Sequence, residues 1–252
     1  MVTAIIQARM GATRLPGKPL MEVCGKPLLY HQLERVKRAK TIDQVVVATT
    51  ENPQDDEIVA FCEQNKYLYF RGDENDVLTR YYHCAQQYQA KVIVRLTGDC
   101  PLVDPEIIDD TVRLFKEARS DFSANTVPPE TSCFPDGSDV EVFSMEALQR
   151  AYDECENPHD REHVTFYFWK YSNGFSTSQL KSDIDRSKYR ITVDYPEDFK
   201  VIQYVFDELA RKKMFGTLEE IIAILDCNKT ITDLNSNYYF GIGWEQKRNS
   251  SQ

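Results

Sequence analysis

A short loop near the start of the chain carries residues that could bind a chain of phosphates. An apolar run over residues 2–6 leads into it, and two glycines and three cations follow: Arg9, Gly11, Arg14, Gly17 and Lys18. Glycine lets the backbone turn sharply and bring its N–H groups close to an anion. Arginine can hold phosphate oxygens through two N–H groups at once. The pattern predicts a triphosphate-binding loop after a buried strand, with a plain surface turn as the alternative.

The spacing of this loop differs from that of a Walker loop. Five residues separate Gly11 from Gly17, one more than the Walker pattern has. Pro19 also stands where that pattern places a magnesium-binding Ser or Thr. These two departures argue against a P-loop kinase.

Two aspartates follow predicted strands farther along the chain. Asp99 comes after the run 91–96 and Gly98, and Asp194 comes after the run 190–193. Ligands of open parallel sheets bind beyond the carboxyl ends of the strands, so both acids could reach one crevice and hold Mg²⁺ with a triphosphate. The simpler alternatives are a turn residue for Asp99 and a helix cap for Asp194. Glu197 and Asp198 fit partners of a helix dipole.

The elements that must position these residues alternate in type. An apolar run predicts a buried strand over residues 2–6, and β-branched runs predict strands buried on both faces over residues 44–49 and 91–96. Residues 140–143 and 190–193 are also predicted to form strands. Helical periodicity and start signals predict helices over residues 27–39, 55–64, 77–89, 105–118, 145–154, 196–213 and 217–228. The alternation predicts an α/β fold with a mostly parallel central sheet and flanking helices.

Composition narrows the class of protein. The 252 residues carry a net charge of −10, which argues against broad binding to nucleic acid or to an anionic membrane. No apolar run approaches the roughly 20 residues that span a bilayer. The seven cysteines are scattered without a C-x-x-C pair, so we expect reduced thiols, no zinc site and a cytoplasmic protein.

The middle of the chain differs from the first half. We expect one domain over residues 1–235, with an acceptor or dimerisation segment at about 122–185, and a C-terminal tail over 236–252 whose polar end, 246–252, is frayed. Residues 160–171 are strongly aromatic, which favours core packing or a subunit interface over a platform for stacking bases. The aromatic segment, together with the family resemblance described below, leads us to expect a homodimer.

Several motifs together resemble a known family. The runs Ile6–Arg9 and Arg14–Leu20 resemble the signature loop of CMP-KDO synthetases and acylneuraminate cytidylyltransferases, and Val46–Thr49, Thr97–Leu102 and Thr192–Asp198 follow in the family's order. The chain is most similar to the branch typified by spore coat polysaccharide biosynthesis protein F, through the motifs at residues 76–82, 135–143 and 161–165. These motifs extend from about residue 2 to about residue 205.

The resemblance implies a Rossmann-like GT-A nucleotidyltransferase fold with a smaller arm that often forms a dimer. It also implies a reaction in which CTP and an acidic sugar yield a CMP-sugar and pyrophosphate, for polysaccharide or glycoconjugate biosynthesis. Catalysis would rest on Arg9, Lys18, Asp99 and Asp194, of which Asp99 and Asp194 would hold Mg²⁺. The implied nucleotide-binding residues are Ala8, Arg9, Gly11, Arg14, Lys18, Thr49, Arg71 and Arg80.

The acceptor would lie over the middle segment. The implied acceptor-binding residues are Asn125, Asp139, Glu141, Arg161, Glu162 and His163. Asp139 and Glu141 alternate along one predicted strand, so they share a face and could bind sugar hydroxyls. Arg161 would face a carboxylate or phosphate of the acceptor, although residues 161–163 also fit the charged first turn of a helix. Many relatives have Ser at the position of Ala12, so Thr13 or backbone N–H groups would supply that contact.

Two other functions fit parts of the sequence. A glycosyltransferase of similar fold usually presents an Asp-x-Asp pair, and Asp183-Ile184-Asp185 has that form without a strong preceding strand. A non-catalytic nucleotide-binding protein is the second alternative, which the presence of both aspartates, Arg9 and Lys18 disfavours. The acceptor itself stays open among a nonulosonic acid, another sugar acid and a phosphorylated polyol.

Overall fold

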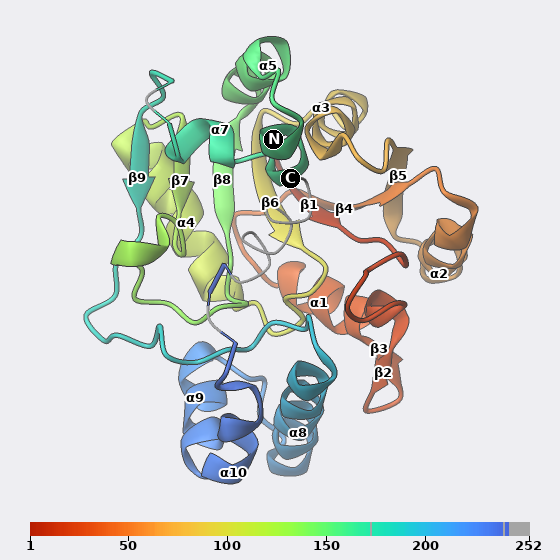
Figure 1. Ribbon diagram of the computed structural model, residues 1–252, viewed down its shortest axis with the longest axis vertical. Helices are drawn as coiled ribbons and strands as arrows, with labels where there is room; N and C mark the ends of the chain where they lie inside the picture. The colour runs from red at the N-terminus through yellow and green to blue at the C-terminus, as the bar shows by residue number, and fades with distance from the viewer. Residues whose placement is uncertain (172, 239, 242–252) are drawn as a thin grey trace.

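A seven-stranded sheet runs through the centre of the protein in the computed structural model, which describes residues 1–171, 173–238 and 240–241 (Figure 1). The strand order is β5-β4-β1-β6-β8-β7-β9. In that order the strands are β5 (Leu68–Gly72), β4 (Gln44–Thr50), β1 (Val2–Gln7), β6 (Val92–Thr97), β8 (Glu141–Ser144), β7 (Phe122–Ala124) and β9 (Thr177–Gln179). Only β8 is antiparallel to its neighbours, so the prediction of a mostly parallel sheet is confirmed.

The central strands are buried on both faces because helices cover both sides of the sheet. In β1, Ala4 and Ile6 belong to one hydrophobic core and Ile5 belongs to the other. In β6, Val94 lies in the first core and Ile93 in the second. Side chains that alternate between two cores explain why these strands appear in the sequence as unbroken apolar runs.

The helices divide between the two cores. The first core takes buried side chains from α1 (Leu28–Val36), α2 (Asp56–Asn65), α4 (Pro105–Ala118), α8 (Pro196–Lys212) and α9 (Leu218–Asp226). The second takes them from α3 (Val77–Gln87), α5 (Met145–Glu154) and α7 (Phe166–Trp169). The shorter elements include the helices α6 (Pro158–His163) and α10 (Lys229–Thr232) and a small ribbon of β2 (Glu22–Val23) and β3 (Lys26–Pro27).

The predicted strand over residues 190–193 is wrong. This segment makes one isolated bridge, from Arg190 to Asp136, because the chains beside it are the loops that carry Asp99 and Asp136 and not a regular strand. The structure also contains β5, β7 and β9, which lie in segments where no strand was predicted. β7 and β9 have only three residues each, too few for a clear alternation to show in the sequence.

The aromatic segment contributes to the second core. Phe168 is buried there against Phe122 and Phe143, whereas Tyr171 remains 43% exposed. The predicted frayed end, residues 246–252, lies outside the described residues. None of the helices within the described ranges is long and apolar enough to cross a membrane.

Candidate active site

The N-terminal loop leaves β1 and folds back on itself before the short 3-10 helix η1 (Lys18–Leu20). The backbone N–H groups of Ala12 and Gly17 both donate to the carbonyl of Met10 at 2.9 Å. Gly17 has φ of 74°, a left-handed conformation that favours glycine and that turns the chain into η1. From this turn the Lys18 side chain extends toward the carboxyl ends of the strands.

Lys18 joins the two predicted metal-binding aspartates. Its Nζ lies 3.1 Å from Asp99 Oδ2 and 2.9 Å from Asp194 Oδ1, and it also donates to the carbonyl of Val193 at 2.7 Å. Three oxygens therefore converge on one cationic nitrogen. The two aspartates do reach one crevice, although 95 residues of chain separate them.

A close approach of three loops produces this convergence. The N–H of Val193 donates to the carbonyl of Asp99 at 2.8 Å, and the hydroxyl of Thr192 donates to the same carbonyl at 3.2 Å. Gly137 packs against this segment so closely that a Cβ atom there would lie 2.3 Å from the nitrogen of Thr192. A side chain at residue 137 would therefore push the Asp194 segment away from Asp99.

Arg190 holds Asp194 from the other side. Its guanidinium is buried and forms ion pairs with Asp136, with Asp198 at 2.9 Å and with Asp194 at 3.5 Å. Asp198 also accepts hydrogen bonds from the N–H groups of Asp194 and Tyr195, at 2.9 and 3.0 Å. Asp198 thus supports the start of α8, and Asp194 keeps its carboxylate in the crevice instead of capping the helix.

The charges around Asp99 stabilise its ionised form. Burial opposes ionisation, but the Lys18 ammonium and hydrogen bonds from Thr97 and Lys18 outweigh it and lower the pKa of Asp99 to about 2. Burial likewise opposes the charge of Lys18, yet Asp99 and Asp194 raise the pKa of its ammonium above the usual value. The Asp99 carboxylate and the Lys18 ammonium therefore both stay charged near neutral pH.

Two adjoining cavities meet at this crevice. We call the first the loop cavity, because it alone is lined by Ala12, Thr13, Leu15, Lys18, Pro19 and Gly98. We call the second the central cavity; it is lined among others by Arg80, Arg95, Cys100, Asp136, Asp139, Glu141, Glu162, His163, Thr165 and Arg190. Both cavities share Gln7, Ala8, Arg9, Arg14, Thr97, Asp99 and Asp194. A ligand that fills both would pass directly over the two aspartates.

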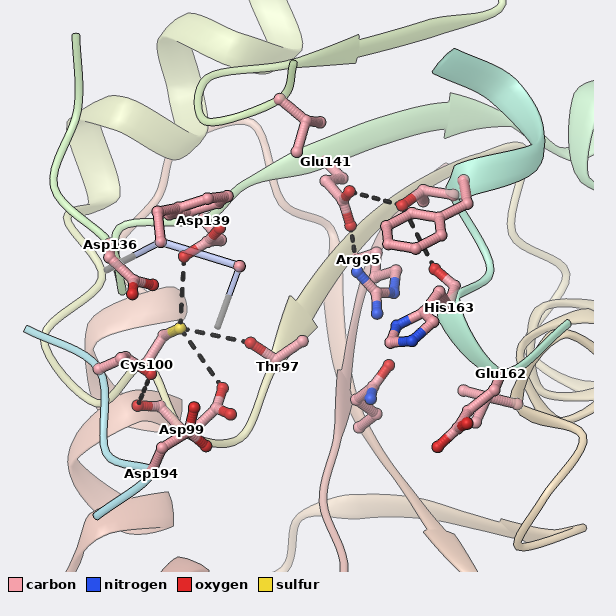
Figure 2. A pocket seen from close by; sticks show the side chains of 18 of the residues that line it. Arg95, Thr97, Asp99, Cys100, Asp136, Asp139, Glu141, Glu162, His163 and Asp194 are labelled. Atoms are coloured by element: carbon pink, nitrogen blue, oxygen red, sulfur yellow. Dashed lines mark hydrogen bonds and ion pairs between the residues drawn. The ribbon is translucent and has the colours of Figure 1, made fainter. Parts of the chain in front are cut away.

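The central cavity has two sides of different chemistry. Figure 2 shows Asp99, Cys100, Asp136, Asp139 and Asp194 grouped on one side and Arg95, Glu141, Glu162 and His163 on the other. On the second side, Arg95 and Glu141 form a buried ion pair from neighbouring strands, and the Thr165 hydroxyl donates to Glu141 at 2.6 Å. This cavity offers both anionic and hydrogen-bonding groups, which suits a ligand with many hydroxyls.

Asp139 lies on the acidic side and carries an unusual proton affinity. Burial raises the pKa of its carboxyl to about 6, although the Thr126 hydroxyl and the Gly137 N–H donate to it at 2.7 and 2.9 Å. The pKa of the neighbouring Cys100 thiol is also raised, by burial and by Asp99. Cys100 is therefore a neutral thiol here and not a nucleophile.

The structure brings most of the predicted site residues to these two cavities. Those that line one or both are Ala8, Arg9, Arg14, Lys18, Arg80, Asp99, Asp139, Glu141, Glu162, His163 and Asp194. Arg14 reaches Asp194 at 3.0 Å, and Arg9 reaches Glu74 at 3.2 Å. Phe240 and Gly241, from the predicted tail, line the central cavity as well.

Three predicted nucleotide-binding residues lie outside both cavity linings. Gly11 lies against the Gln54 side chain, and Thr49 is fully buried in β4. Arg71 donates to the carbonyls of Thr50, at the end of β4, and of Asn52, and it pairs with Asp56 at 2.7 Å. Their surroundings place these three residues in support of the loops around the site.

Two predicted acceptor-binding residues also lie outside both linings. Asn125 is buried and links two chain segments, because its side chain bonds the carbonyl of Ser138 and the N–H of Val140, each at 2.8 Å. Arg161 donates to Asp76 at 2.8 Å and to backbone carbonyls, and so ties α6 to α3. The Arg161 side chain lines neither cavity.

Sequence reasoning missed several residues of the site, chiefly Arg95, Asp136 and Arg190. Arg95 carried a signal, because a lone arginine in an otherwise apolar strand must find a buried partner. Arg190 carried none, since its partners Asp136 and Asp198 come from separate loops and helices. The Asp-x-Asp motif of the glycosyltransferase alternative, Asp183 and Asp185, is exposed and lines neither cavity.

Comparison with known proteins now identifies the family. The family model described as cytidylyltransferase matches residues 3–243. The chain belongs to the cytidylyltransferase family. The family assignment and the fold that the sequence motifs implied are thereby confirmed, and the protein is a CTP-dependent nucleotidyltransferase.

Individual relatives of this cytidylyltransferase agree with that assignment. It is 31% identical over 230 residues to the spore coat polysaccharide biosynthesis protein SpsF of Bacillus subtilis, covering 89% of this chain and 93% of SpsF. It is 35% identical over 111 residues to the 3-deoxy-manno-octulosonate cytidylyltransferase of Geobacter sulfurreducens, covering 44% of each protein. A cytidylyltransferase structure from Leptospira borgpetersenii superposes with a TM-score of 0.85 at 35% identity, covering 92% of this chain and 96% of the other.

The crevice of this cytidylyltransferase has a donor set that suits Mg²⁺. Carboxylate oxygens of Asp99 and Asp194 and the carbonyl of Val193 all lie within 3.1 Å of one cation, the Lys18 ammonium. Mg²⁺ prefers such oxygen ligands and usually keeps waters or substrate phosphates as well. No cluster of three or more His, Cys, Asp or Glu suited to a metal occurs in the described part of the chain.

Proposed function

We propose that this cytidylyltransferase transfers CMP from CTP to an acidic sugar in a Mg²⁺-dependent reaction that releases pyrophosphate. The single observation that carries the proposal is the meeting of two aspartates with Arg14 and Lys18 where the loop cavity joins the central cavity. The triphosphate would lie in the loop cavity and the acceptor in the central cavity. The reacting α-phosphorus would then lie over Asp99 and Asp194.

The reaction would be an in-line displacement. A hydroxyl of the acceptor would give up its proton to water, and its oxygen would form a bond to the α-phosphorus while the bond from that phosphorus to the pyrophosphate oxygen breaks. Asp99 and Asp194 would hold Mg²⁺, which would supply charge stabilisation at the phosphoryl oxygens. Arg9, Arg14 and Lys18 bind and orient the triphosphate and stabilise the charge on the leaving pyrophosphate.

The central cavity supports a polyhydroxylated acceptor. Asp139, Glu141, Glu162 and His163 line it and can accept or donate hydrogen bonds to hydroxyl groups. The acidic nature of the sugar rests on the Geobacter relative, whose name specifies an octulosonate. A role in surface polysaccharide or glycoconjugate biosynthesis rests on SpsF, whose name specifies spore coat polysaccharide biosynthesis. We place the reaction in the cytoplasm, where CTP is supplied.

We further propose that the enzyme acts as a homodimer. Partly exposed aromatic residues of the segment around α7, such as Tyr171, would contribute to the interface. Light scattering on the purified protein tests this. A mass near twice 29.2 kDa supports the dimer, and a mass near 29.2 kDa refutes it.

A pyrophosphate-release assay tests the main proposal. Purified protein is incubated with Mg²⁺, each of the four ribonucleoside triphosphates and a panel of acidic sugars. We expect release with CTP and one sugar acid, and loss of release in Asp99→Asn. Release with another nucleotide only, or undiminished release in the variant, would refute the proposed chemistry.

A further inference from the structure

The cations around Asp194 and Asp99 already satisfy both carboxylates. Lys18 reaches one oxygen of each, and the second oxygen of Asp194 faces Arg14 at 3.0 Å and Arg190 at 3.5 Å. Two carboxylates thus face three cationic side chains. A divalent cation that approached this group on its own would meet two carboxylates that are already paired with cationic side chains.

Lys18 occupies the point on which the metal ligands converge. Its three ammonium N–H groups are used by the three oxygens of Asp99, Asp194 and Val193. The side chain is only 12% exposed, and it lines the loop cavity where the triphosphate is proposed to lie. A metal ion and the Lys18 ammonium therefore cannot both occupy the position between these three oxygens.

Lys18 and Arg190 differ in how freely their charged groups can move away from Asp194. Arg190 is anchored by Asp136 and Asp198 in addition to Asp194, and it is buried. Lys18 has a flexible four-carbon stem, so its ammonium can move several ångströms without a change in the backbone. The triphosphate offers it a second set of anionic oxygens on the same side of the crevice.

We propose that Lys18 is an exchangeable counter-ion, which occupies the metal position in the nucleotide-free enzyme and transfers to the triphosphate when the metal–nucleotide complex binds. This inference rests on the proposed function. It makes metal binding conditional on CTP, because only a polyanion can draw Lys18 away. It also assigns to Lys18 opposite effects on the metal before and after the nucleotide arrives.

The test is Mn²⁺ binding, measured by electron paramagnetic resonance, to the wild-type protein and to Lys18→Met, with and without CTP. Without CTP we expect Lys18→Met to bind Mn²⁺ at least about tenfold more tightly than wild type, because one positive charge has left the metal position. Lys37→Met is the matched control, since Lys37 also forms an ion pair but is exposed just after α1 and lines neither cavity. It should bind Mn²⁺ as wild type does.

The outcomes separate the two proposals. If Lys18→Met is folded, judged by its melting curve, and binds Mn²⁺ no more tightly than wild type without CTP, the exchange is refuted. If wild type with CTP holds no more Mn²⁺ than Asp99→Asn with CTP, the proposed metal–nucleotide site itself fails.

A second variant keeps the test open if Lys18→Met does not fold. Arg14→Met removes another cation from Asp194 at a half-buried position. The exchange predicts a smaller rise in Mn²⁺ affinity without CTP for this variant, and no rise would refute it.

Discussion

The loop cavity and the central cavity lie on the same edge of the sheet but are built in different ways. Five of the six residues that line only the loop cavity come from one stretch of chain, residues 12–19. The central cavity gathers residues from segments spread between residues 7 and 241. In the loop cavity, Lys18 pairs with carboxylates that are proposed to bind the metal once the nucleotide arrives. In the central cavity, Arg95 and Glu141 hold each other in a buried pair. The first region is suited to exchange partners, and the second to keep a preformed shape.

The largest expected effect follows from breaking the region where the cavities meet. Asp99→Asn and Asp194→Asn should each lower kcat/KM by at least about 10²–10³-fold, because each removes a carboxylate that is proposed to hold Mg²⁺ at the reacting phosphoryl group. Initial rates of pyrophosphate release measure this. Asp183→Asn, in the exposed Asp-x-Asp motif, should leave the rate unchanged. A loss in Asp183→Asn together with normal rates in the other two would reverse the assignment of the site.

Breaking the buried pair tests whether the central cavity is preformed. Arg95→Met leaves the Glu141 carboxylate buried without its partner and should lower the free energy of unfolding by about 3–5 kcal/mol. Urea denaturation measures the loss. The variant should also raise the KM for the acceptor more than the KM for CTP. An equal rise in both KM values would show that the two cavities do not serve different substrates.

Asp139 offers a test by pH. Its folded-state pKa of about 6 exceeds the ordinary value of 3.8, so its contribution to stability is fully present below pH 3.8 and is lost as the pH rises through 6. Asp139→Asn should remove this loss. Its free energy of unfolding should therefore exceed that of wild type by about 1–3 kcal/mol between pH 4 and pH 7. Asp99 has the opposite sign, because its pKa of about 2 makes its contribution present above 3.8 and lost as the pH falls through 2. Urea denaturation across this pH range measures the difference. If the stability of Asp139→Asn depended on pH as that of wild type does, the raised pKa of Asp139 would be contradicted.

The smallest effect is expected at Arg161. Its guanidinium is held by Asp76 and by backbone carbonyls outside the central cavity. Arg161→Met should therefore lower the free energy of unfolding by about 1 kcal/mol and change the acceptor KM by less than about threefold. The neighbouring variant Glu162→Gln, inside the cavity lining, should change that KM more. A tenfold rise in acceptor KM for Arg161→Met would place this residue at the acceptor after all.

Much of the fold could be predicted because its signals are local. Two helices, α4 and α5, begin and end at the predicted residues, 105–118 and 145–154. In both, a capping side chain accepts from a nearby backbone N–H, and a strong apolar stripe faces the core. The segment 190–193 failed because its apolar residues satisfy the same pattern in an extended loop as in a strand. Pairing partners decide between the two, and they lie far away in the sequence.

The site divides along the same line. The chemistry of the loop and the identity of Lys18, Asp99 and Asp194 could be read from the sequence, since glycines, cations and acids at strand ends act through local geometry and charge. Their arrangement came only with the tertiary structure. The hydrogen bond from Val193 to the carbonyl of Asp99 and the close packing of Gly137 bring distant segments together. Arg190 holds Asp194 in the crevice, whereas Arg161 and Asn125 link chain segments outside the cavities. These positions depend on contacts between distant segments, which no local sequence pattern encodes.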